Sequence, residues 1–372
     1  MINTKEYYNV IDSNEPVYLR NRAISWGCDD FYDRVTVGDL SSTVVTFRIS
    51  PVISRTIREY ESITLESSLS SFYQWISNDM DSLNPFVDIP LYSSNTVSVY
   101  GDYLRFKEIF ECIPTFGNWD ALFDRKINNF NEENATLWIG SKGSHTPLHY
   151  DTYGKNVIIQ IKGKKRWKLW KQNPQHYDML PLRLPFEESS IYSSYDPNSN
   201  HNIPPDFEFL LQQGDVLFVP KHYWHYVETE SDVAVSINVW LSEDNDSHDQ
   251  LSEALSLFIF GAMKQAVDDA DNKFCTNDIN NGWISPSELG GTLACERGDD
   301  NDADDNDNDK VGVSHDSNYL LVKKTLKNVI GRDLNDDEED EMIKRIVNRL
   351  VHPTTIKACL KDIVPYIKQY HH

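Results

Sequence analysis

The stretch TLWIGSKGSHTPLHYDTYGKNVIIQIKGKKRWKLW, residues 136–170, decides the fold expected for this chain. Short runs of aromatic and β-branched residues, such as TLWIGS, NVIIQIKG and RWKLW, are separated there by turn residues. Three further runs of the same kind, DVLFVP, HYVETE and VAVSINVW, follow before residue 241. Short strands repeated in this way are typical of an antiparallel barrel or sandwich. We therefore expect residues 136–241 to be mainly β.

Two histidines and an aspartate within these runs predict a metal site. If residues 144–151 are extended, His149 and Asp151 share one face of the strand and Tyr150 points away. This pair alone is weak evidence, because a surface histidine near an aspartate is common. A later histidine, His225, opens another strand. Two histidines and one carboxylate with open positions form the facial ligand set of non-haem Fe(II), although zinc can use the same ligands.

The order of these features resembles that of JmjC-type, Fe(II)- and 2-oxoglutarate-dependent oxygenases. The resemblance covers roughly residues 15–241 and is densest over 137–241, in TLWIGSKGSHTPLHYDTYGKNVIIQIKGKKRW, PFEESSIYS and GDVLFVPKHYWHYVE. These segments are most similar to the subfamily that associates with a small heat-shock protein. The resemblance implies an α+β fold that is mainly β. Its centre is a double-stranded β-helix (cupin, or jelly-roll) barrel, with N-terminal helices and strands and a C-terminal helical segment.

The resemblance also implies roles for individual residues. His149, Asp151 and His225 match the iron ligands. The residues that match contacts to 2-oxoglutarate or lie near it and the metal are Thr146, Lys165, Asn156, Asn238 and one tyrosine, either Tyr103 or Tyr100. A lysine suits the distal carboxylate of 2-oxoglutarate, because a carboxylate inside a low-dielectric barrel needs a cation. Lys165 would then point inward, with Lys164 and Arg166 on the outer face. Taken alone, the KGKKRWK segment fits a solvated hairpin better, and the neighbouring metal triad reverses that preference.

The sequence suggests five segments. They are an N-terminal α/β support region packed on the barrel (1–135), the barrel core (136–241), a helical extension (242–295), an acidic disordered linker (296–315) and a C-terminal helical region (316–372). In the first segment, EPVYLRN and STVVTFRI predict strands, and SSLSSFYQWI and GDYLRFKEIFECI predict helices. The apolar stripes of the C-terminal helices require burial, either on the barrel or against a second copy in a homodimer.

Composition narrows the partners and the compartment. The 372 residues carry a net charge of −23, which disfavours nucleic acid as a partner because phosphate binding needs a basic face. The start of the chain has no signal-peptide pattern, and no apolar run is long enough to cross a bilayer. Five scattered cysteines suit a reducing compartment. We expect a cytoplasmic protein, with the nucleus as the alternative.

The expected function is a dioxygenase that uses Fe(II), 2-oxoglutarate and O2 to hydroxylate a protein side chain, giving succinate and CO2. The main alternative is a weakly catalytic or non-catalytic protein that binds a small heat-shock protein in the stress response. Histone lysine demethylation and tRNA hydroxylation, which relatives with this motif set carry out, rank lower. The intact set of metal ligands together with Thr146 and Lys165 favours the enzyme, because a retired site usually loses a ligand.

Overall fold

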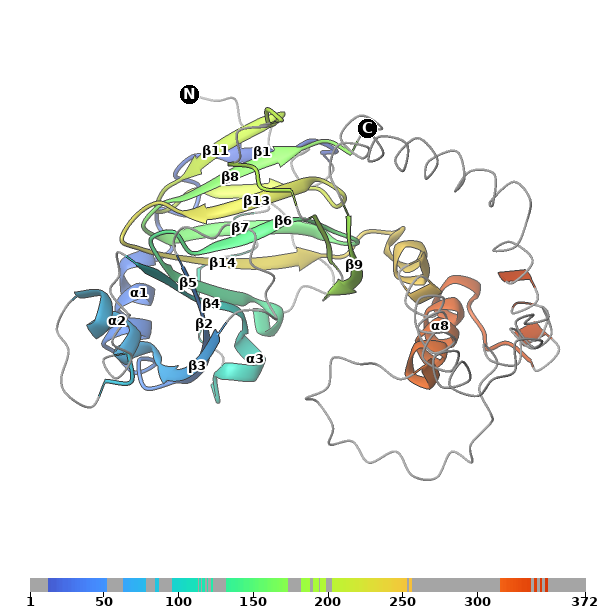
Figure 1. Cartoon of the computed structure of the whole chain (residues 1–372), viewed down its shortest axis with the longest axis horizontal. Coiled ribbons are helices and arrows are strands. Elements are labelled where there is room, and N and C mark those ends of the chain that lie inside the picture. Colours follow the sequence, from blue (N-terminus) through green and yellow to red (C-terminus); the bar gives the residue numbers. More distant parts are fainter. Residues whose placement is uncertain are drawn as a thin grey trace, which may run out of the picture. The chain divides into compact units, whose positions relative to one another are not determined.

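The computed structural model contains two compact units, residues 1–246 and 247–372 (Figure 1). The structure describes residues 13–51, 63–77, 84–86, 96–112, 114, 116–117, 119, 122, 132–172, 182–187, 190–193, 195–198, 203–252, 254–255, 315–335, 338–339, 342 and 345–346. Among these residues, no helix combines the length and the apolar character needed to span a membrane.

The first unit is built on two antiparallel sheets. One sheet has eight strands in the order β1 (Val17–Leu19), β12 (Val216–Val219), β7 (Lys155–Lys162), β14 (Val233–Leu241), β5 (Thr136–Ser141), β4 (Val97–Arg105), β2 (Val44–Pro51) and β3 (Ile63–Ser68). The other has six, in the order β11 (Phe207–Leu211), β8 (Lys165–Trp170), β13 (Trp224–Thr229), β6 (His145–Asp151), β10 (Ser190–Ser193) and β9 (Leu182–Glu187). Each strand run predicted between residues 136 and 241 matches one of these strands to within one residue at either end. The architecture is that of a jelly-roll barrel with added helices, as the sequence predicts.

Two helices cover the outer face of the eight-stranded sheet. They are α1 (Cys28–Thr36) and α2 (Leu69–Ser77), which lie beside β2, β4 and β5 in Figure 1. Phe31 of α1 and Phe72 of α2 belong to the same buried apolar cluster as Phe47 of β2 and Ile159 of β7. The Phe47 and Phe72 rings stack with their centroids 5.0 Å apart. The helix predicted in SSLSSFYQWI is α2. The main apolar core therefore lies outside the barrel, which leaves the barrel interior for polar groups.

The segment GDYLRFKEIFECI differs from its predicted helix. Residues up to Arg105 belong to β4, and the helix α3 covers only Phe106–Ile109. β4 forms ladders with β2 and β5, and this pairing outweighs the helical spacing of the apolar residues. The helix prediction was therefore wrong for residues 101–105. The register between β4 and β5 shifts between Gly101 and Leu104, which marks a β-bulge.

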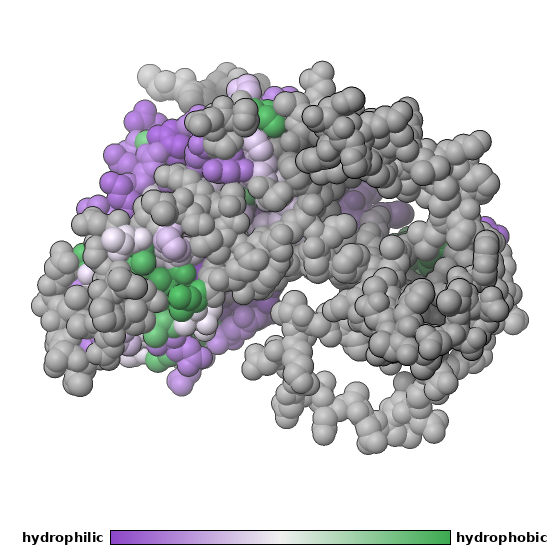
Figure 2. Space-filling view, in the orientation of Figure 1, coloured by the Kyte–Doolittle hydropathy of each residue, from purple (hydrophilic) through white to green (hydrophobic). Residues whose placement is uncertain are grey.

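Strand β8 has the alternation that the lysine prediction requires. Lys165 and Trp167 are buried, whereas Arg166 and Lys168 are partly exposed. Arg166 forms ion pairs with Glu208 and Glu230 on the outer surface. Figure 2 shows a largely hydrophilic surface over β8 and β11. The tight turn before β8 contains Gly163 at φ +68°, a backbone conformation that favours glycine.

In the described part of the second unit, helix α8 (His315–Ile330) contains all of the helix predicted in SNYLLVKKTLKNVIG except Gly331. Val322 of α8 is buried, and Lys323 forms an ion pair with Glu339 at 2.7 Å. Residues 247–252 and 254–255, at the start of the expected helical extension, are helical. The rest of that extension, nearly all of the acidic linker and most of the expected C-terminal helices lie outside the described residues.

Candidate metal centre

Strands β6 and β13 bring the three predicted ligands together. His149 and Asp151 lie on the same face of β6, and His225 is paired with His149 across the β6–β13 ladder. One ligand atom from each residue lies within 4.8 Å of the other two, and all three side chains are buried. The Nε2 atoms of His149 and His225 are 3.9 and 4.0 Å from the Asp151 carboxylate.

Backbone contacts fix the orientation of both imidazoles. Nδ1 of His149 lies 2.8 Å from the Pro147 carbonyl oxygen, and Nδ1 of His225 lies 2.8 Å from the Tyr223 carbonyl oxygen. Since a carbonyl only accepts, each Nδ1 donates its hydrogen, and in the neutral form of the ring each Nε2 then presents a lone pair. Two lone pairs and a carboxylate thus converge in a buried space. This donor set suits a divalent cation. The hydrogen bonds from Nδ1 to backbone carbonyl oxygens fix the ring orientations, as in metal–histidine sites.

The Asp151 carboxylate is held by two donors. Nδ2 of Asn156 and Nε1 of Trp240 both donate to its Oδ2 atom, each at 3.1 Å. Asn238 lies behind Asn156 and donates to its Oδ1 atom at 2.8 Å. The two asparagines predicted near the metal therefore lie beside Asp151: Asn156 contacts it directly, and Asn238 contacts it through Asn156.

The ligands lie in a cavity of about 210 Å³. Its wall includes all nine residues that the sequence proposed for metal or 2-oxoglutarate: Tyr100, Tyr103, Thr146, His149, Asp151, Asn156, Lys165, His225 and Asn238. The rest of the wall is largely aromatic and small polar residues, including Trp138, Trp167, Trp240, Ser190 and Ser236. Residues from both sheets face this one space.

Lys165 is a cation buried in the wall of this cavity. Its ammonium donates to Ser236 Oγ at 2.8 Å and to the Tyr100 hydroxyl at 3.5 Å. Among the described residues, no carboxylate lies within ion-pair distance of it. Burial lowers its pKa from 10.5 to about 7, and the field of Asp102 only partly offsets this effect. A buried cation without a counter-ion is costly, so the site fits a ligand carboxylate.

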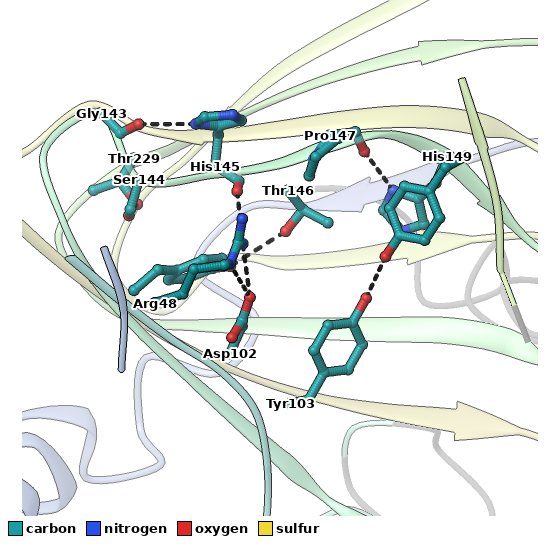
Figure 3. Close-up of polar contacts among 12 residues, drawn as sticks. Arg48, Asp102, Tyr103, Gly143, Ser144, His145, Thr146, Pro147, His149 and Thr229 are labelled. Atoms are coloured by element: carbon teal, nitrogen blue, oxygen red, sulfur yellow. Dashed lines mark hydrogen bonds and ion pairs between the residues drawn. The ribbon is translucent and has the colours of Figure 1, made fainter. Parts of the chain in front are cut away.

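The tyrosine beside Lys165 is Tyr100. Its hydroxyl lies 3.5 Å from Thr146 Oγ1, and its ring lies between Lys165 and Arg48, at 5.2 and 5.5 Å from the two cations. Tyr103 also lines the cavity, but its hydroxyl hydrogen-bonds to the Tyr192 hydroxyl at 2.6 Å (Figure 3). Tyr103 lies in the bulge of β4 with φ +52°. Spacing alone did not separate the two tyrosines, and this geometry favours Tyr100 as the neighbour of the lysine.

Several residues around the site had no signal in the sequence. Arg48 donates to Asp102 at 2.6 Å in a buried ion pair and to the His145 carbonyl oxygen at 3.1 Å (Figure 3). Tyr192 of β10 stacks on the His149 ring, with centroids 5.1 Å apart. These contacts join segments far apart in the chain, and only the alternation of β2 and β4 hints that Arg48 and Asp102 face the same side as Tyr100.

Comparison with known proteins identifies the family. The family model described as a cupin-like domain matches residues 5–247. The chain belongs to the cupin-like domain family. The match covers the first unit almost completely, including the N-terminal strands β1–β4. This result agrees with the jelly-roll sheets and with the JmjC-type motif order.

Three relatives illustrate the range of this cupin-like family. HSPB1-associated protein 1 from Homo sapiens is 30% identical over 294 residues, covering 75% of this chain and 57% of that protein. JmjC domain-containing protein D from Dictyostelium discoideum is 30% identical over 192 residues, or 45% and 42% of the two chains. Lysine-specific demethylase JMJ30 from Arabidopsis thaliana is 28% identical over 176 residues, or 41% and 39%. The chain spans little more than half the length of the HSPB1-associated protein that it matches.

Proposed function

We propose that this cupin-like protein is an Fe(II)- and 2-oxoglutarate-dependent dioxygenase that hydroxylates a protein side chain. One observation carries the proposal: the cavity that holds the His149–Asp151–His225 group is also lined by buried Lys165, whose ammonium contacts two hydroxyls and, among the described residues, no carboxylate. A metal site alone fits many chemistries. A metal site next to a buried lysine fits a keto acid that chelates the metal and has a second carboxylate for the lysine.

Each residue has a defined task in this proposal. His149, Asp151 and His225 would hold the iron and leave its other positions open. Lys165, Tyr100 and Thr146 would hold the distal carboxylate of 2-oxoglutarate, the first through charge and the other two through hydroxyl donors. Iron held by these residues would supply the O2 chemistry that links conversion of 2-oxoglutarate to succinate and CO2 with hydroxylation of the substrate. The wall beside these residues includes the aromatic side chains of Trp138 and Trp167.

The experiment that tests this function measures succinate formation. The full chain would be incubated with Fe(II), ascorbate, 2-oxoglutarate, O2 and a broad panel of candidate proteins and peptides. We expect succinate in excess of a matched His149→Ala reaction, and a 16 Da increase in the mass of one panel member. Succinate at the level of the His149→Ala control across the whole panel would argue against catalysis.

The low pKa of Lys165 predicts that 2-oxoglutarate binds more tightly at lower pH. Only the charged lysine pairs with a carboxylate, and its charged fraction falls as the pH rises through about 7. Above that pH, binding requires uptake of a proton, so the dissociation constant should rise by about 20-fold between roughly pH 6.5 and 8.5. Calorimetric titration of the Mn(II)-loaded protein at several pH values measures this change. A dissociation constant that does not vary with pH would contradict it.

The geometry predicts different effects for the two candidate tyrosines. Tyr100→Phe removes a hydroxyl 3.5 Å from the Lys165 ammonium and should weaken 2-oxoglutarate binding by about tenfold, the usual value of a hydrogen bond to a charged group. Tyr103→Phe removes a hydroxyl bonded to Tyr192 and should change that affinity by less than about threefold. The same titration applied to both variants checks the ranking. The reverse order would assign the contact to Tyr103.

The names of relatives support a second candidate function, binding of a small heat-shock protein. In this alternative the barrel is a scaffold for a partner, and the metal group is not required. A pull-down with a purified small heat-shock protein, using the unaltered chain and the His149→Ala variant, separates the two proposals. Retention of the partner by both proteins, with no succinate formation by either, would favour the binding role.

The chemistry of the product separates the remaining alternatives. Lysine demethylation, suggested by the name of the Arabidopsis relative, releases formaldehyde from a methylated peptide, whereas side-chain hydroxylation does not. Formaldehyde detection in the succinate assay therefore distinguishes them. Hydroxylation of a transfer RNA is disfavoured by the net charge of −23.

A further inference from the structure

A chain of three hydrogen bonds links Trp138 to the metal-binding aspartate. Nε1 of Trp138 on β5 donates to Oδ1 of Asn238 on β14 at 2.7 Å. Nδ2 of Asn238 donates to Oδ1 of Asn156 on β7 at 2.8 Å, and Nδ2 of Asn156 donates to Oδ2 of Asp151 at 3.1 Å. The strands β5, β14 and β7 are neighbours in the eight-stranded sheet, and Asp151 ends β6 in the other sheet. The chain therefore crosses from one sheet to the other at the metal group.

The two end groups of this hydrogen-bond series, the Trp138 indole and the Asp151 carboxylate, determine the orientation of the Asn238 and Asn156 amides. An indole nitrogen can only donate, and an ionised carboxylate can only accept, whereas an asparagine amide can do either according to its flip. Between a donor-only end and an acceptor-only end, one orientation of Asn238 and one of Asn156 satisfies all three bonds. Turning either amide over would place like groups against each other at both of its contacts. The donor-to-acceptor direction of all three hydrogen bonds thus follows from having a tryptophan at position 138.

These hydrogen bonds hold the Asp151 carboxylate in one orientation. Oδ2 of Asp151 is held between Asn156 and Trp240, while Oδ1 is turned toward Nε2 of His149 at 3.9 Å. We propose that Trp138 and Asn238 are positioning residues that orient Asp151 as a metal ligand through Asn156. This inference rests on the proposed metal centre, and nothing in the HxD motif identifies Trp138. Trp138 also packs against the Tyr103 ring at 4.7 Å, so a purely structural role has to be separated by experiment.

The first variant is Trp138→Phe, which keeps an aromatic ring and removes the donor. Binding of Co(II) to the full chain, followed by calorimetry and by the visible absorption of the bound ion, should weaken by about tenfold, as for other changes behind a metal ligand. The absorption spectrum of the bound ion should also change. The matched control is Trp224→Phe, which removes the same atoms from a buried indole whose nitrogen has no hydrogen-bond partner among the described residues. That control should keep its Co(II) affinity and spectrum even if its stability falls.

A double-mutant cycle tests whether Trp138 acts through Asn156. In an Asn156→Ala background the series of hydrogen bonds from Trp138 to Asp151 is already interrupted. Adding Trp138→Phe to that background should therefore change Co(II) affinity by less than about twofold. Additive losses would overturn the positioning role and assign the effect to packing. Equal Co(II) affinity in the unaltered protein and Trp138→Phe would overturn it as well, while leaving the metal centre intact. Failure of the unaltered protein to bind Co(II) would overturn the metal centre and the positioning role together.

Discussion

Replacing Asp151 with alanine is expected to abolish both metal binding and 2-oxoglutarate turnover. The change removes the only carboxylate of the ligand group among the described residues and leaves two imidazoles in a buried cavity. Replacing a residue that hydrogen-bonds to a metal ligand typically costs about 10–100-fold in metal affinity. Loss of a ligand itself should therefore weaken Co(II) or Mn(II) binding by more than about 100-fold. Calorimetry measures the affinity, and the succinate assay should fall to its metal-free background.

The control for this variant is Asp215→Asn. Asp215 is also a buried aspartate, but it accepts hydrogen bonds from the Tyr18 hydroxyl and from the Asn21 and Gln212 backbone amides, away from the cavity. Its replacement should reduce stability and leave metal affinity unchanged. Circular dichroism would establish that Asp151→Ala is folded. A folded Asp151→Ala protein with the metal affinity of the unaltered chain would remove the basis for the proposed enzyme.

Lys165→Met should separate 2-oxoglutarate binding from metal binding. Methionine fills similar space without charge, so a bound carboxylate would face an uncompensated apolar pocket. Removing one member of a buried charge pair costs about 3–5 kcal/mol, which corresponds to a loss of at least about 100-fold in 2-oxoglutarate affinity. Co(II) affinity should remain as in the unaltered protein, because the Lys165 ammonium contacts Ser236 and Tyr100 rather than a metal ligand.

The same variant should be more stable than the unaltered protein in the absence of ligand. The pKa of Lys165 is lowered on folding from 10.5 to about 7, so the unfolded chain binds more protons between these values and stability rises with pH across that window. Lys165→Met removes this slope and the cost of burying the lysine. The control is Lys155→Met: Lys155 is equally buried, but its ammonium bonds to the Ser13 carbonyl oxygen at 2.9 Å outside the cavity. It should lose stability and keep 2-oxoglutarate affinity, and a loss of stability in Lys165→Met would contradict the prediction.

Strand alternation explains why the sequence could place the three candidate metal ligands together. His149 and Asp151 are two residues apart on a regular strand, so their shared face follows from the spacing alone. His225 is the second residue of β13, and the ladder between β13 and β6 pairs it with His149. The inward direction of Lys165 follows from the same alternation along β8 once the turn at Gly163 fixes the register.

Departures from regular alternation explain what the sequence could not supply. The bulge in β4 turns Tyr103 toward the cavity although Tyr100 already faces it, so counting residues cannot choose between them. The ladders of β4 with β2 and β5 were hidden by an apolar spacing that also suits a helix. The ion pair of Arg48 with Asp102 and the stacking of Tyr192 on His149 depend on strand neighbours that lie far apart in the sequence.

The continuous eight-stranded sheet limits how this chain can be divided. Because β4 is hydrogen-bonded to β5, a fragment starting at residue 136 would present a bare strand edge, and such edges promote aggregation. The fragment would also lack Tyr100 and Asp102, the two groups that contact or influence Lys165 from the β4 side. Residues 136–241, which carry the motifs, are therefore not expected to fold as a separate domain. Chimeras with other barrels need junctions upstream of β1 and downstream of β14.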